Sequence, residues 1–421
     1  MINNIAHVRR ESEEDQALED HLSGVADLAS KFMATLGLES VGRLVGLLHD
    51  LGKASEAFNE YIRGEGDYSR GEIDHSTAGA IYLYRREPAL LNENADRIIA
   101  FEMMELAIAS HHSGLIDVIT TDGENNYSRR MEKSTQYEEN VQRIGKPILD
   151  EAETLIPAAV SSLEMMIRRV IDDSSNVKDG GCFRLGLLNR FLLSALIDAD
   201  RIDTISFETN RPYIPKYADF QKLSDRLEIY LSSFPSDGEV SEIRRKVSDE
   251  CLSASSRSRG IYTLSVPTGG GKTLSSLRFA INHARIHGME RVIFVAPYLT
   301  ILEQNAAVVR KALGDLGDDE LVECHSNIDV GRDDSGYVAT IDSGMDSWDA
   351  PIIFTSMVQF LEALFSSGTR RVRRMHNLAN SVIVFDEIQS LPIKTTFMFN
   401  ETISFLSLIH ISEPTRLRRI S

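Results

Sequence analysis

The segment Val266–Thr273 constrains the fold of this chain more than any other feature of the sequence. It reads Val-Pro-Thr-Gly-Gly-Gly-Lys-Thr, directly follows the apolar run Ile261–Val266 and directly precedes the helical pattern Leu274–Ala284. A strand, a glycine-rich turn and a helix in this order form a phosphate-binding loop, because backbone N–H groups and the positive end of the helix surround the phosphate oxygens. We expect Lys272 to reach the β- and γ-phosphates of a nucleotide and the Thr273 hydroxyl to bind Mg²⁺. The predicted nucleotide-binding residues of this loop are Thr268, Gly269, Gly270, Gly271, Lys272 and Thr273.

Short apolar runs alternate with helical patterns through the rest of the C-terminal part. The runs are Val292–Ala296, Pro351–Phe354 and Ser381–Phe385. Strands that alternate with helices predict a parallel, doubly wound sheet, so an α/β domain is the expected C-terminal fold. Polar residues beyond these runs, in Gln304-Asn305 and Thr355-Ser356, have groups that could contact a nucleic-acid backbone.

A pair of acidic residues follows the last of these runs. Asp386 and Glu387 stand at the end of Ser381–Phe385. At the carboxyl end of a parallel strand, Asp386 can hold the Mg²⁺ of bound ATP, and Glu387 can orient and deprotonate the attacking water. An Asp-Glu pair after a strand is a weak indication alone, but together with the phosphate-binding loop it predicts an ATPase.

The first 230 residues or so show a different pattern, in which helix follows helix. The apolar spacing is helical at Val41–Leu51, Ile98–Ile108, Leu155–Ile171 and Leu185–Ile197. The segment Ser232–Glu242 concentrates Ser, Pro, Asp and Gly, a composition typical of a loop or linker. We therefore expect a helical domain over residues 1–235 and the α/β domain over residues 236–421.

Histidines and aspartates gather at the ends of the N-terminal helices. Six of the eleven histidines lie within the first 112 residues, and His49-Asp50 ends an apolar helical pattern. Imidazole nitrogens together with carboxylate oxygens suit divalent ions such as Mn²⁺, Fe²⁺, Co²⁺ or Ni²⁺. Any one of these histidines is more often structural than metal-binding, so the prediction depends on the whole set. The predicted ligands are His21, His49, Asp50, His75, His111, His112 and Asp200, with Asp198 as the alternative to Asp200.

The composition limits the partners and the compartment. The chain has 45 basic and 63 acidic residues, a formal net charge of −18, so nucleic acid can bind only through local basic patches or bound metal. Three cysteines far apart exclude a disulfide scaffold and a cysteine zinc site. The polar N-terminus is unlike a signal peptide and no apolar run is long enough to span a bilayer, so we expect a cytoplasmic protein without a membrane partner.

The order H…HD…H…HH…D of the N-terminal histidines and aspartates resembles the HD phosphohydrolase superfamily in its extended two-metal form. The C-terminal part resembles a DEAD/DEAH-like helicase core of superfamily 2, through the segments VPTGGGKT, APYLTILEQN, CHSN, FTSMVQF and FDEIQ. An HD site before such a core in one chain resembles the CRISPR-associated nuclease-helicases of type I systems, from about His21 to Pro392. The resemblance implies an all-α HD-type metal-dependent nuclease domain followed by an α/β RecA-like P-loop domain, the first helicase lobe.

This resemblance also implies roles for residues and partners. Asp50 would bind metal and act in catalysis, Lys53 would lie beside the scissile phosphate, and Glu387 would act in ATP hydrolysis. Gln389 would couple the nucleotide to DNA contacts. Proteins of this family are recruited by the RNA-guided Cascade complex and degrade the displaced DNA strand. The implied function is therefore a metal-dependent single-stranded DNA nuclease coupled to an ATP-dependent helicase, in antiviral defence.

The C-terminus departs from the family pattern. A superfamily 2 motor has a second RecA-like lobe that supplies arginines to the ATP site, whereas this sequence ends shortly after Gln389, and we expect a truncation after the first lobe. The cluster Arg370, Arg371, Arg373 and Arg374 fits a phosphate contact or a solvated helix face equally well. Two alternatives stay open: an HD-type nucleotide phosphohydrolase, and an ATP-binding interaction module whose HD site is vestigial.

Overall fold

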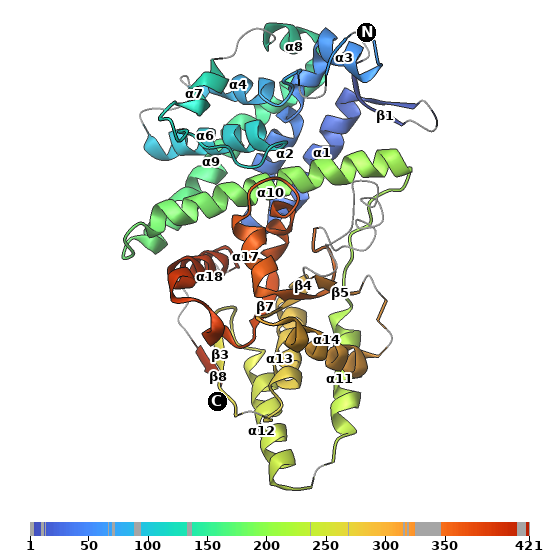
Figure 1. Ribbon diagram of the computed structural model, residues 1–421, viewed down its shortest axis with the longest axis vertical. Helices are drawn as coiled ribbons and strands as arrows, with labels where there is room; N and C mark the ends of the chain where they lie inside the picture. The colour runs from blue at the N-terminus through green and yellow to red at the C-terminus, as the bar shows by residue number, and fades with distance from the viewer. Residues whose placement is uncertain are drawn as a thin grey trace. The chain divides into compact units, whose positions relative to one another are not determined.

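The computed structural model describes residues 4–9, 12, 14–65, 67–69, 72–87, 94–132, 137–235, 237–267, 269–314, 316–317, 320–324, 347–410 and 418–420. The chain divides into two compact units, drawn with their elements in Figure 1. Unit 1 comprises residues 1–214 and Ser366–His376, and unit 2 comprises Pro215–Phe365 and residues 377–421. A segment from within the C-terminal half of the sequence therefore belongs to the N-terminal unit.

The described part of unit 1 consists of helices and one short hairpin. The hairpin pairs β1 (Ile5–Arg9) with β2 (Glu14–Ala17) in antiparallel register. The helices are α1 (Leu18–Met33), α2 (Glu39–Leu48), α3 (Glu56–Ile62), α4 (Ala78–Tyr84), α6 (Ala95–Ser110), α7 (Asn126–Met131), α8 (Tyr137–Arg143), α9 (Lys146–Ser174) and α10 (Gly180–Thr209). Short 3₁₀ turns include η2 (Leu51–Ala54) and η4 (Val372–Arg374). The helical patterns expected from the sequence lie in α2 with η2, α6, α9 and α10.

Two glycines of α2 let it pack closely against α1. A Cβ atom at Gly46 would lie 2.5 Å from the Cα of Ala26, and one at Gly42 would lie 2.4 Å from the carbonyl oxygen of Ala29. Backbone atoms in a close-packed interior cannot yield that much space, so larger residues would push the two helices apart. This packing brings the first turn of α1 beside the last turn of α2, where two of the predicted metal ligands stand.

Helix α10 is a long, apolar and largely buried helix of unit 1. Among the described residues it is the one helix long and apolar enough to cross a membrane, but 67% of its most apolar window is buried inside the structure. It packs against α1, α6 and α9. Asp198 and Asp200 lie in its buried stretch. Such burial is typical of a core helix in a globular domain.

Unit 2 contains a parallel sheet covered by helices. The strand order is β5-β6-β4-β7, with all neighbours parallel, for β4 (Arg291–Ala296), β5 (Leu321–Cys324), β6 (Ile352–Ser356) and β7 (Ser381–Phe385). The helices are α11 (Phe220–Ser232), α12 (Glu239–Ala254), α13 (Lys272–His287), α14 (Leu299–Leu313), α17 (Met357–Phe365) and α18 (Thr396–His410). The short strand β3 (Tyr262–Leu264) pairs in parallel with β8 (Arg418–Ile420). The expected α/β fold with a parallel sheet is confirmed.

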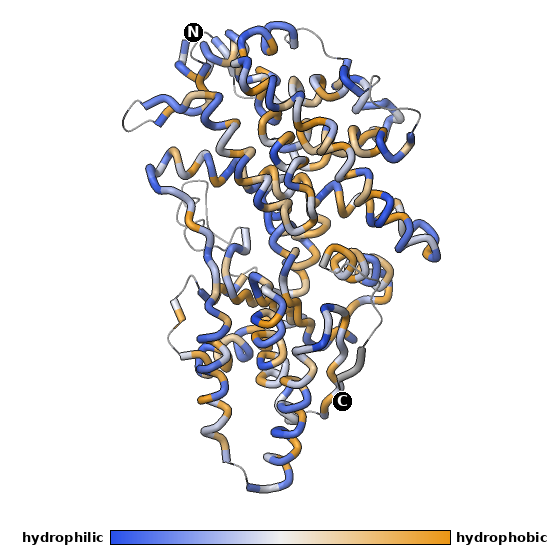
Figure 2. Tube along the Cα trace, turned by 180° about the vertical axis from the view of Figure 1, so that it is seen from behind, coloured by the Kyte–Doolittle hydropathy of each residue, from blue (hydrophilic) through white to orange (hydrophobic). Residues whose placement is uncertain are grey.

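The middle of the sheet forms the core of unit 2. All residues of β4 are buried, and the rings of Phe294 and Phe354 stack with centroids 4.7 Å apart. Buried runs of this kind are typical of parallel strands with helices on both faces, and Figure 2 shows these strands as apolar segments. The segment Ser232–Glu242, expected to link two domains, lies here at the turn between α11 and α12, both of which belong to unit 2.

Candidate metal and nucleotide sites

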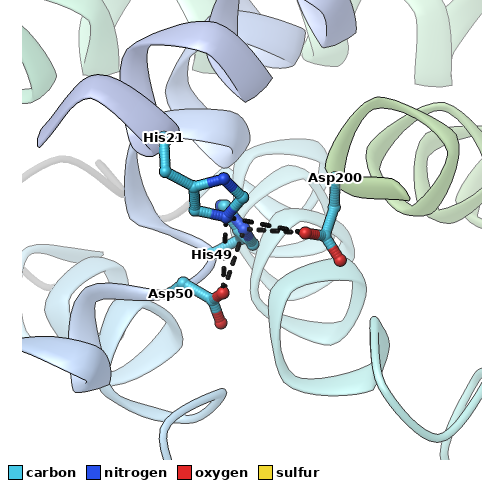
Figure 3. Close-up of side chains that lie close together, drawn as sticks. All are labelled: His21, His49, Asp50 and Asp200. Carbon is cyan, nitrogen blue, oxygen red and sulfur yellow. Dashed lines mark ion pairs between the residues drawn. The ribbon is translucent and has the colours of Figure 1, made fainter. Parts of the chain in front are cut away.

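The seven predicted metal ligands come from five parts of unit 1 and gather in one place. His21 lies on α1, and His49 and Asp50 directly follow α2. The others lie before α4, after α6 and on α10: His75, His111, His112 and Asp200. Three overlapping sets have all their ligand atoms within 4.8 Å of one another: His21, His49, Asp50 and Asp200; Asp50, His75 and His112; His111, His112 and Asp200. Figure 3 shows the imidazoles of the first set directed at its two carboxylates.

Asp50 stands between two groups of histidines. Its Oδ2 atom lies 3.6 Å from Nε2 of His21 and 3.3 Å from Nε2 of His49. Its Oδ1 atom lies 3.2 Å from Nε2 of His111 and 3.6 Å from Nε2 of His112. One oxygen of this carboxylate thus faces each group, which is the arrangement that a carboxylate shared by two ions requires.

Hydrogen bonds outside the cluster fix which nitrogen of each imidazole faces it. The Nδ1 atoms of His49, His111 and His75 donate to the backbone carbonyls of Gly46 at 2.8 Å, Ile108 at 2.6 Å and Ile73 at 3.1 Å. The Nδ1 atom of His21 donates to the Asp203 carboxylate at 2.7 Å. A proton held on Nδ1 leaves the lone pair on Nε2, which is how protein surroundings orient histidine ligands toward a metal.

The donor set fits a divalent ion. The Nε2 atoms of His21 and His49 are buried and have no hydrogen-bond partner among the described residues. A buried polar atom without a partner costs about 1–3 kcal/mol. Two such lone pairs beside the carboxylates of Asp50 and Asp200 offer the nitrogen and oxygen ligands that divalent transition metals prefer.

The charges of the cluster also favour a cation. Burial by itself would raise the pKa of Asp50, but Lys53, with Nζ 2.7 Å from Oδ2, and His49 hold that pKa well below its usual value. Burial would lower the pKa of His49, whereas the carboxylates of Asp50 and Asp200 raise it to about 10. In the metal-free protein a proton on Nε2 of His49 and the ammonium of Lys53 therefore balance the buried carboxylates of Asp50 and Asp200. A metal ion would displace that proton and bind the Nε2 lone pair that it leaves.

Two residues of this cluster were not singled out from the sequence. His7 on β1 accepts a hydrogen bond from Lys53 through Nε2 at 3.2 Å, and its ring meets that of His21 edge-to-face at 4.8 Å. Asp203 orients His21, as described above. Asp203 follows Asp200 by three residues and so shares its helix face, a spacing that could have identified it. The sequence around His7 carries no comparable pattern.

Asp198 has a different partner. Its Oδ1 atom accepts hydrogen bonds from Nε and Nη2 of Arg373 at 2.7 and 2.6 Å, and its Oδ2 atom lies 3.4 Å from Nε2 of His376. All three side chains are buried in unit 1. The structure thus brings Asp200, rather than Asp198, to the other predicted metal ligands. Arg373 and Arg374 are both buried, so the solvated helix face considered for the arginine cluster is wrong for these two.

The phosphate-binding loop of unit 2 needs its glycines. Gly269 and Gly271 have φ angles of +81° and +83°, which side chains rarely tolerate. A Cβ atom at Gly270 would lie 2.3 Å from the Val266 side chain. Thr268 lies outside the described residues. Helix α13 begins at Lys272, so its N-terminal end faces the loop, as a phosphate site requires.

The two carboxylates predicted to act in ATP hydrolysis, Asp386 and Glu387, face this loop across the end of the sheet. The Lys272 ammonium lies 3.6 Å from the Glu387 carboxylate. The Thr273 hydroxyl donates to Oδ1 of Asn305 at 3.0 Å, and Nδ2 of Asn305 donates to Asp386 at 3.3 Å. These residues line one wall of a cavity of about 1100 Å³ that extends between β3, β7, α13 and α18. A cavity of this volume is large enough for a nucleoside triphosphate.

The polar residues Glu387, Gln389, Asn305 and Thr355 near the strand ends all have local partners. Glu387 has a left-handed backbone with φ +49°, and Gln389 donates a hydrogen bond to its carboxylate. Backbone strain of this kind clusters at functional sites. Asn305 faces the nucleotide site, and Thr355 is buried and bonds the carbonyl of Cys324 at 3.1 Å. The buried Thr355 side chain cannot contact a nucleic acid in this structure, whereas the contact considered for Asn305 stays a prediction.

Comparisons with known proteins find a family match in each part of the chain. Residues 18–152 match the family described as "HD domain", and residues 238–402 match "Type III restriction enzyme, res subunit". The chain is 25% identical to the "CRISPR-associated nuclease/helicase Cas3" of Haloferax volcanii, over 82% of this chain and 42% of that protein.

Solved structures share the fold over all of this chain. The crystal structure of T. fusca Cas3 has a TM-score of 0.57 at 16% identity, with 50% of its chain covered. A chain of the "CRISPR RNA-guided surveillance complex, pre-nicking" has a TM-score of 0.51 at 14% identity, with 47% covered. The present chain thus spans about half the length of the relatives that it matches. With its buried cluster of predicted metal ligands, its phosphate-binding loop, and an HD-domain match before a helicase-region match, the chain is a homologue of the Cas3 nuclease/helicases.

Proposed function

We propose that unit 1 is a metal-dependent nuclease that cuts single-stranded DNA, and that unit 2 is the ATP-binding lobe of a helicase that works with it. The observation that carries this proposal is the pair of buried Nε2 atoms of His21 and His49 that face two ionised carboxylates, with Asp50 between two groups of histidines. The names of the relatives support a role in CRISPR antiviral defence.

The residues of unit 1 suit phosphodiester hydrolysis. Divalent ions at such a site generate hydroxide near neutral pH and stabilise the leaving oxygen. Asp50 would hold both ions, and His21, His49 and Asp200 would complete one coordination shell. The Lys53 ammonium, which contacts Asp50 at 2.7 Å, would turn to the scissile phosphate once metal neutralises that carboxylate. Mn²⁺, Fe²⁺, Co²⁺ and Ni²⁺ all accept these ligands.

Unit 2 would bind ATP with Mg²⁺ and support its hydrolysis. The loop from Gly269 to Gly271 and the ammonium of Lys272 would hold the phosphates, and Thr273 and Asp386 would hold Mg²⁺. The Glu387 carboxylate lies 3.6 Å from the Lys272 ammonium. If Lys272 holds the γ-phosphate, Glu387 would stand beside it and could orient and deprotonate the attacking water. Gln389, which bonds Glu387, would transmit the state of the nucleotide to DNA contacts.

The proposed partners are single-stranded DNA and the RNA-guided Cascade surveillance complex, in the cytoplasm. A net charge of −18 opposes general attraction to DNA, so the strand would be held by local contacts and by the metal ions themselves. Recruitment by a guide complex supplies the sequence selection that such a nuclease lacks.

The test is cleavage of circular single-stranded DNA by purified protein with Mn²⁺, repeated with EDTA. We expect cutting that EDTA abolishes, and about one or two tightly held ions per chain. Asp50→Asn should remove both the activity and the bound metal. The control is Asp20→Asn, which changes an exposed carboxylate of the same unit and should keep both. Protein that holds no metal, or full activity in Asp50→Asn, would contradict the proposal. Hydrolysis of free nucleotides without DNA cutting would favour the nucleotide phosphohydrolase.

A further inference from the structure

We propose that Asn305 is a positioning residue for the Mg²⁺ of bound ATP, acting through the two protein ligands of that ion. This inference rests on the proposed ATP site. The phosphate-binding loop supplies one ligand, Thr273, and the end of β7 supplies the other, Asp386. The structure joins these two side chains through the single amide of Asn305, which comes from a third element, α14.

The chemistry of the two partners fixes the orientation of the amide. An ionised carboxylate only accepts hydrogen bonds, so Asp386 must face the NH₂ group of Asn305, at 3.3 Å. The oxygen of that amide then faces the Thr273 hydroxyl, at 3.0 Å, and accepts its hydrogen bond. Each end of Asn305 therefore has the one partner that suits it.

This arrangement prepares both ligands for a cation. When the Thr273 hydroxyl donates its hydrogen bond to Asn305, its oxygen lone pairs are free to face Mg²⁺. When Asn305 donates to Oδ2 of Asp386, the second oxygen of that carboxylate stays available for the ion or for one of its waters. Residues that orient metal ligands from outside the coordination shell typically change metal affinity by 10–100-fold when they are replaced.

Helix α14 holds Asn305 firmly in place. The adjacent residues Leu302, Ala306 and Val309 are buried in the core of unit 2, whereas Asn305 itself is half-buried at the edge of the nucleotide cavity. Its neighbour Gln304 is exposed. A substitution at Asn305 thus removes polar groups from the site without opening a hole in the core.

The decisive measurement is the affinity for a fluorescent ATP analogue, with Mg²⁺ and with EDTA, in the full 421-residue chain. Asn305→Leu has nearly the same shape but neither hydrogen-bonding group. We expect it to weaken binding in Mg²⁺ by about tenfold and to leave binding in EDTA unchanged. Because the fluorescence reports the nucleotide, metal bound in unit 1 does not enter the result. Asn305→Ala should show the same loss. Because alanine is too small to clash with its neighbours, this second variant excludes a packing effect of the leucine side chain.

Two comparisons separate positioning from a general structural effect. Gln304→Leu, the same kind of change one residue earlier, should bind the analogue like the wild type in both conditions. In a Thr273→Val background, Asn305→Leu should cost less than it does in the wild type, because one of the two groups that it orients is already absent. If the losses of affinity from Thr273→Val and Asn305→Leu simply add, Asn305 does not act through Thr273, and the proposal is contradicted.

The outcomes distinguish this inference from the proposed function. A wild-type protein that binds no ATP analogue with Mg²⁺ would overturn the ATP site itself. A wild-type protein that binds it, with Asn305→Leu equally tight in Mg²⁺, would overturn only the role of Asn305. Equal weakening in Mg²⁺ and in EDTA would show that Asn305 supports the nucleotide pocket as a whole and does not act through the ion.

Discussion

Glu105 lies deep in unit 1, two turns before the histidines that end α6, and its carboxyl group receives a hydrogen bond from the Tyr127 hydroxyl. Burial raises the pKa of Glu105 to about 8, although the Tyr127 hydrogen bond opposes this. The pKa in the unfolded chain is about 4.3. The folded state therefore keeps a proton that the unfolded state loses, and the resulting stability is complete below the unfolded pKa and lost as the pH rises through the folded one.

Glu105→Gln should consequently flatten the pH dependence of the unfolding free energy. The wild type should lose on the order of a few kcal/mol between about pH 5 and pH 8, while the variant keeps the neutral side chain throughout. Urea denaturation at several pH values measures both curves. The exposed Glu124→Gln is the matched control and should follow the wild type. Parallel curves for Glu105→Gln and the wild type would contradict the assignment.

His49 makes a second prediction at this scale, because its proton and a metal ion compete for Nε2. The carboxylates raise its pKa to about 10 in the metal-free protein, so the ring is protonated at neutral pH and must lose that proton to bind metal. Mn²⁺ binding should therefore release protons, and the Kd should fall by about tenfold for each pH unit between pH 6 and pH 8. Titration calorimetry in buffers of different ionisation enthalpy counts the protons. Binding without proton release would show that His49 is not a ligand.

Residue types and spacing could predict which side chains gather, but not how they face one another. The sequence placed His49 and Asp50 together because adjacent residues at a helix end cannot be far apart. It left Asp198 and Asp200 open, since both follow the same apolar run. Two residues apart on a helix point to nearly opposite sides, so one faced the cluster and the other faced Arg373. Only the packing of α10 decides which.

At the scale of elements, one buried stretch of α10 contributes both to the predicted metal site and to the packing of the segment Ser366–His376. Asp200 faces the metal ligands, while Asp198 pairs with Arg373 of the segment Ser366–His376. This segment also packs Val372 against Leu193 and Ile197 of α10. The ion pair is almost fully buried, and removing one member of such a pair leaves an uncompensated charge that costs about 3–5 kcal/mol.

Arg373→Met should therefore destabilise unit 1 by several kcal/mol, and Asp198→Asn should recover part of that loss when the two are combined. Arg371→Met, beside it in the sequence and less buried, is the control for removing an arginine from the same segment. Thermal unfolding of the wild type, Arg373→Met, Asp198→Asn and the double variant gives the coupling energy between the two side chains. Equal stability of Arg373→Met and the wild type would mean that the pair contributes nothing to the fold.

Elements with a strong apolar pattern could be predicted, and short or polar ones could not. The run Ser381–Phe385 coincides with β7, and Val292–Ala296 lies within β4, because buried parallel strands are nearly all apolar. The strand β5 has only four residues, and β2 reads Glu-Asp-Gln-Ala, so neither carries a pattern of its own. Both form through pairing with a neighbour, which the sequence does not display.

For the whole molecule, the sequence predicts a helical part followed by an α/β part, and this order is confirmed. The path of Ser366–His376 could not be predicted. It lies between two strands of the sheet in sequence but belongs to the helical unit, and the bond from Arg373 to Asp198 spans 175 residues. Contacts between residues so far apart in the sequence produce no periodic pattern of apolar residues from which they could be predicted. The composition of the segment instead made its arginines resemble a surface patch.

The final prediction follows from the division of the two sites between the two units. Lys272 and the residues around the phosphate-binding loop belong to unit 2, and all the predicted metal ligands belong to unit 1. Lys272→Ala should abolish ATP binding, because the phosphates lose their main protein cation. The same variant should still cut circular single-stranded DNA, at a rate within about twofold of the wild type, because the phosphates of ATP take no part in that reaction. Asp50→Asn should show the reverse, with ATP binding kept and cutting lost.

Both variants and the wild type would be compared under the same Mn²⁺ concentration, with circular dichroism to establish that each is folded. Lys272→Arg is the matched control, since it keeps the positive charge and should lose less affinity for ATP than Lys272→Ala. If folded Lys272→Ala failed to cut strands that are already single, nucleotide binding in unit 2 would control the metal site in unit 1. The nuclease would then depend on ATP for catalysis itself, beyond any use of ATP to deliver the strand.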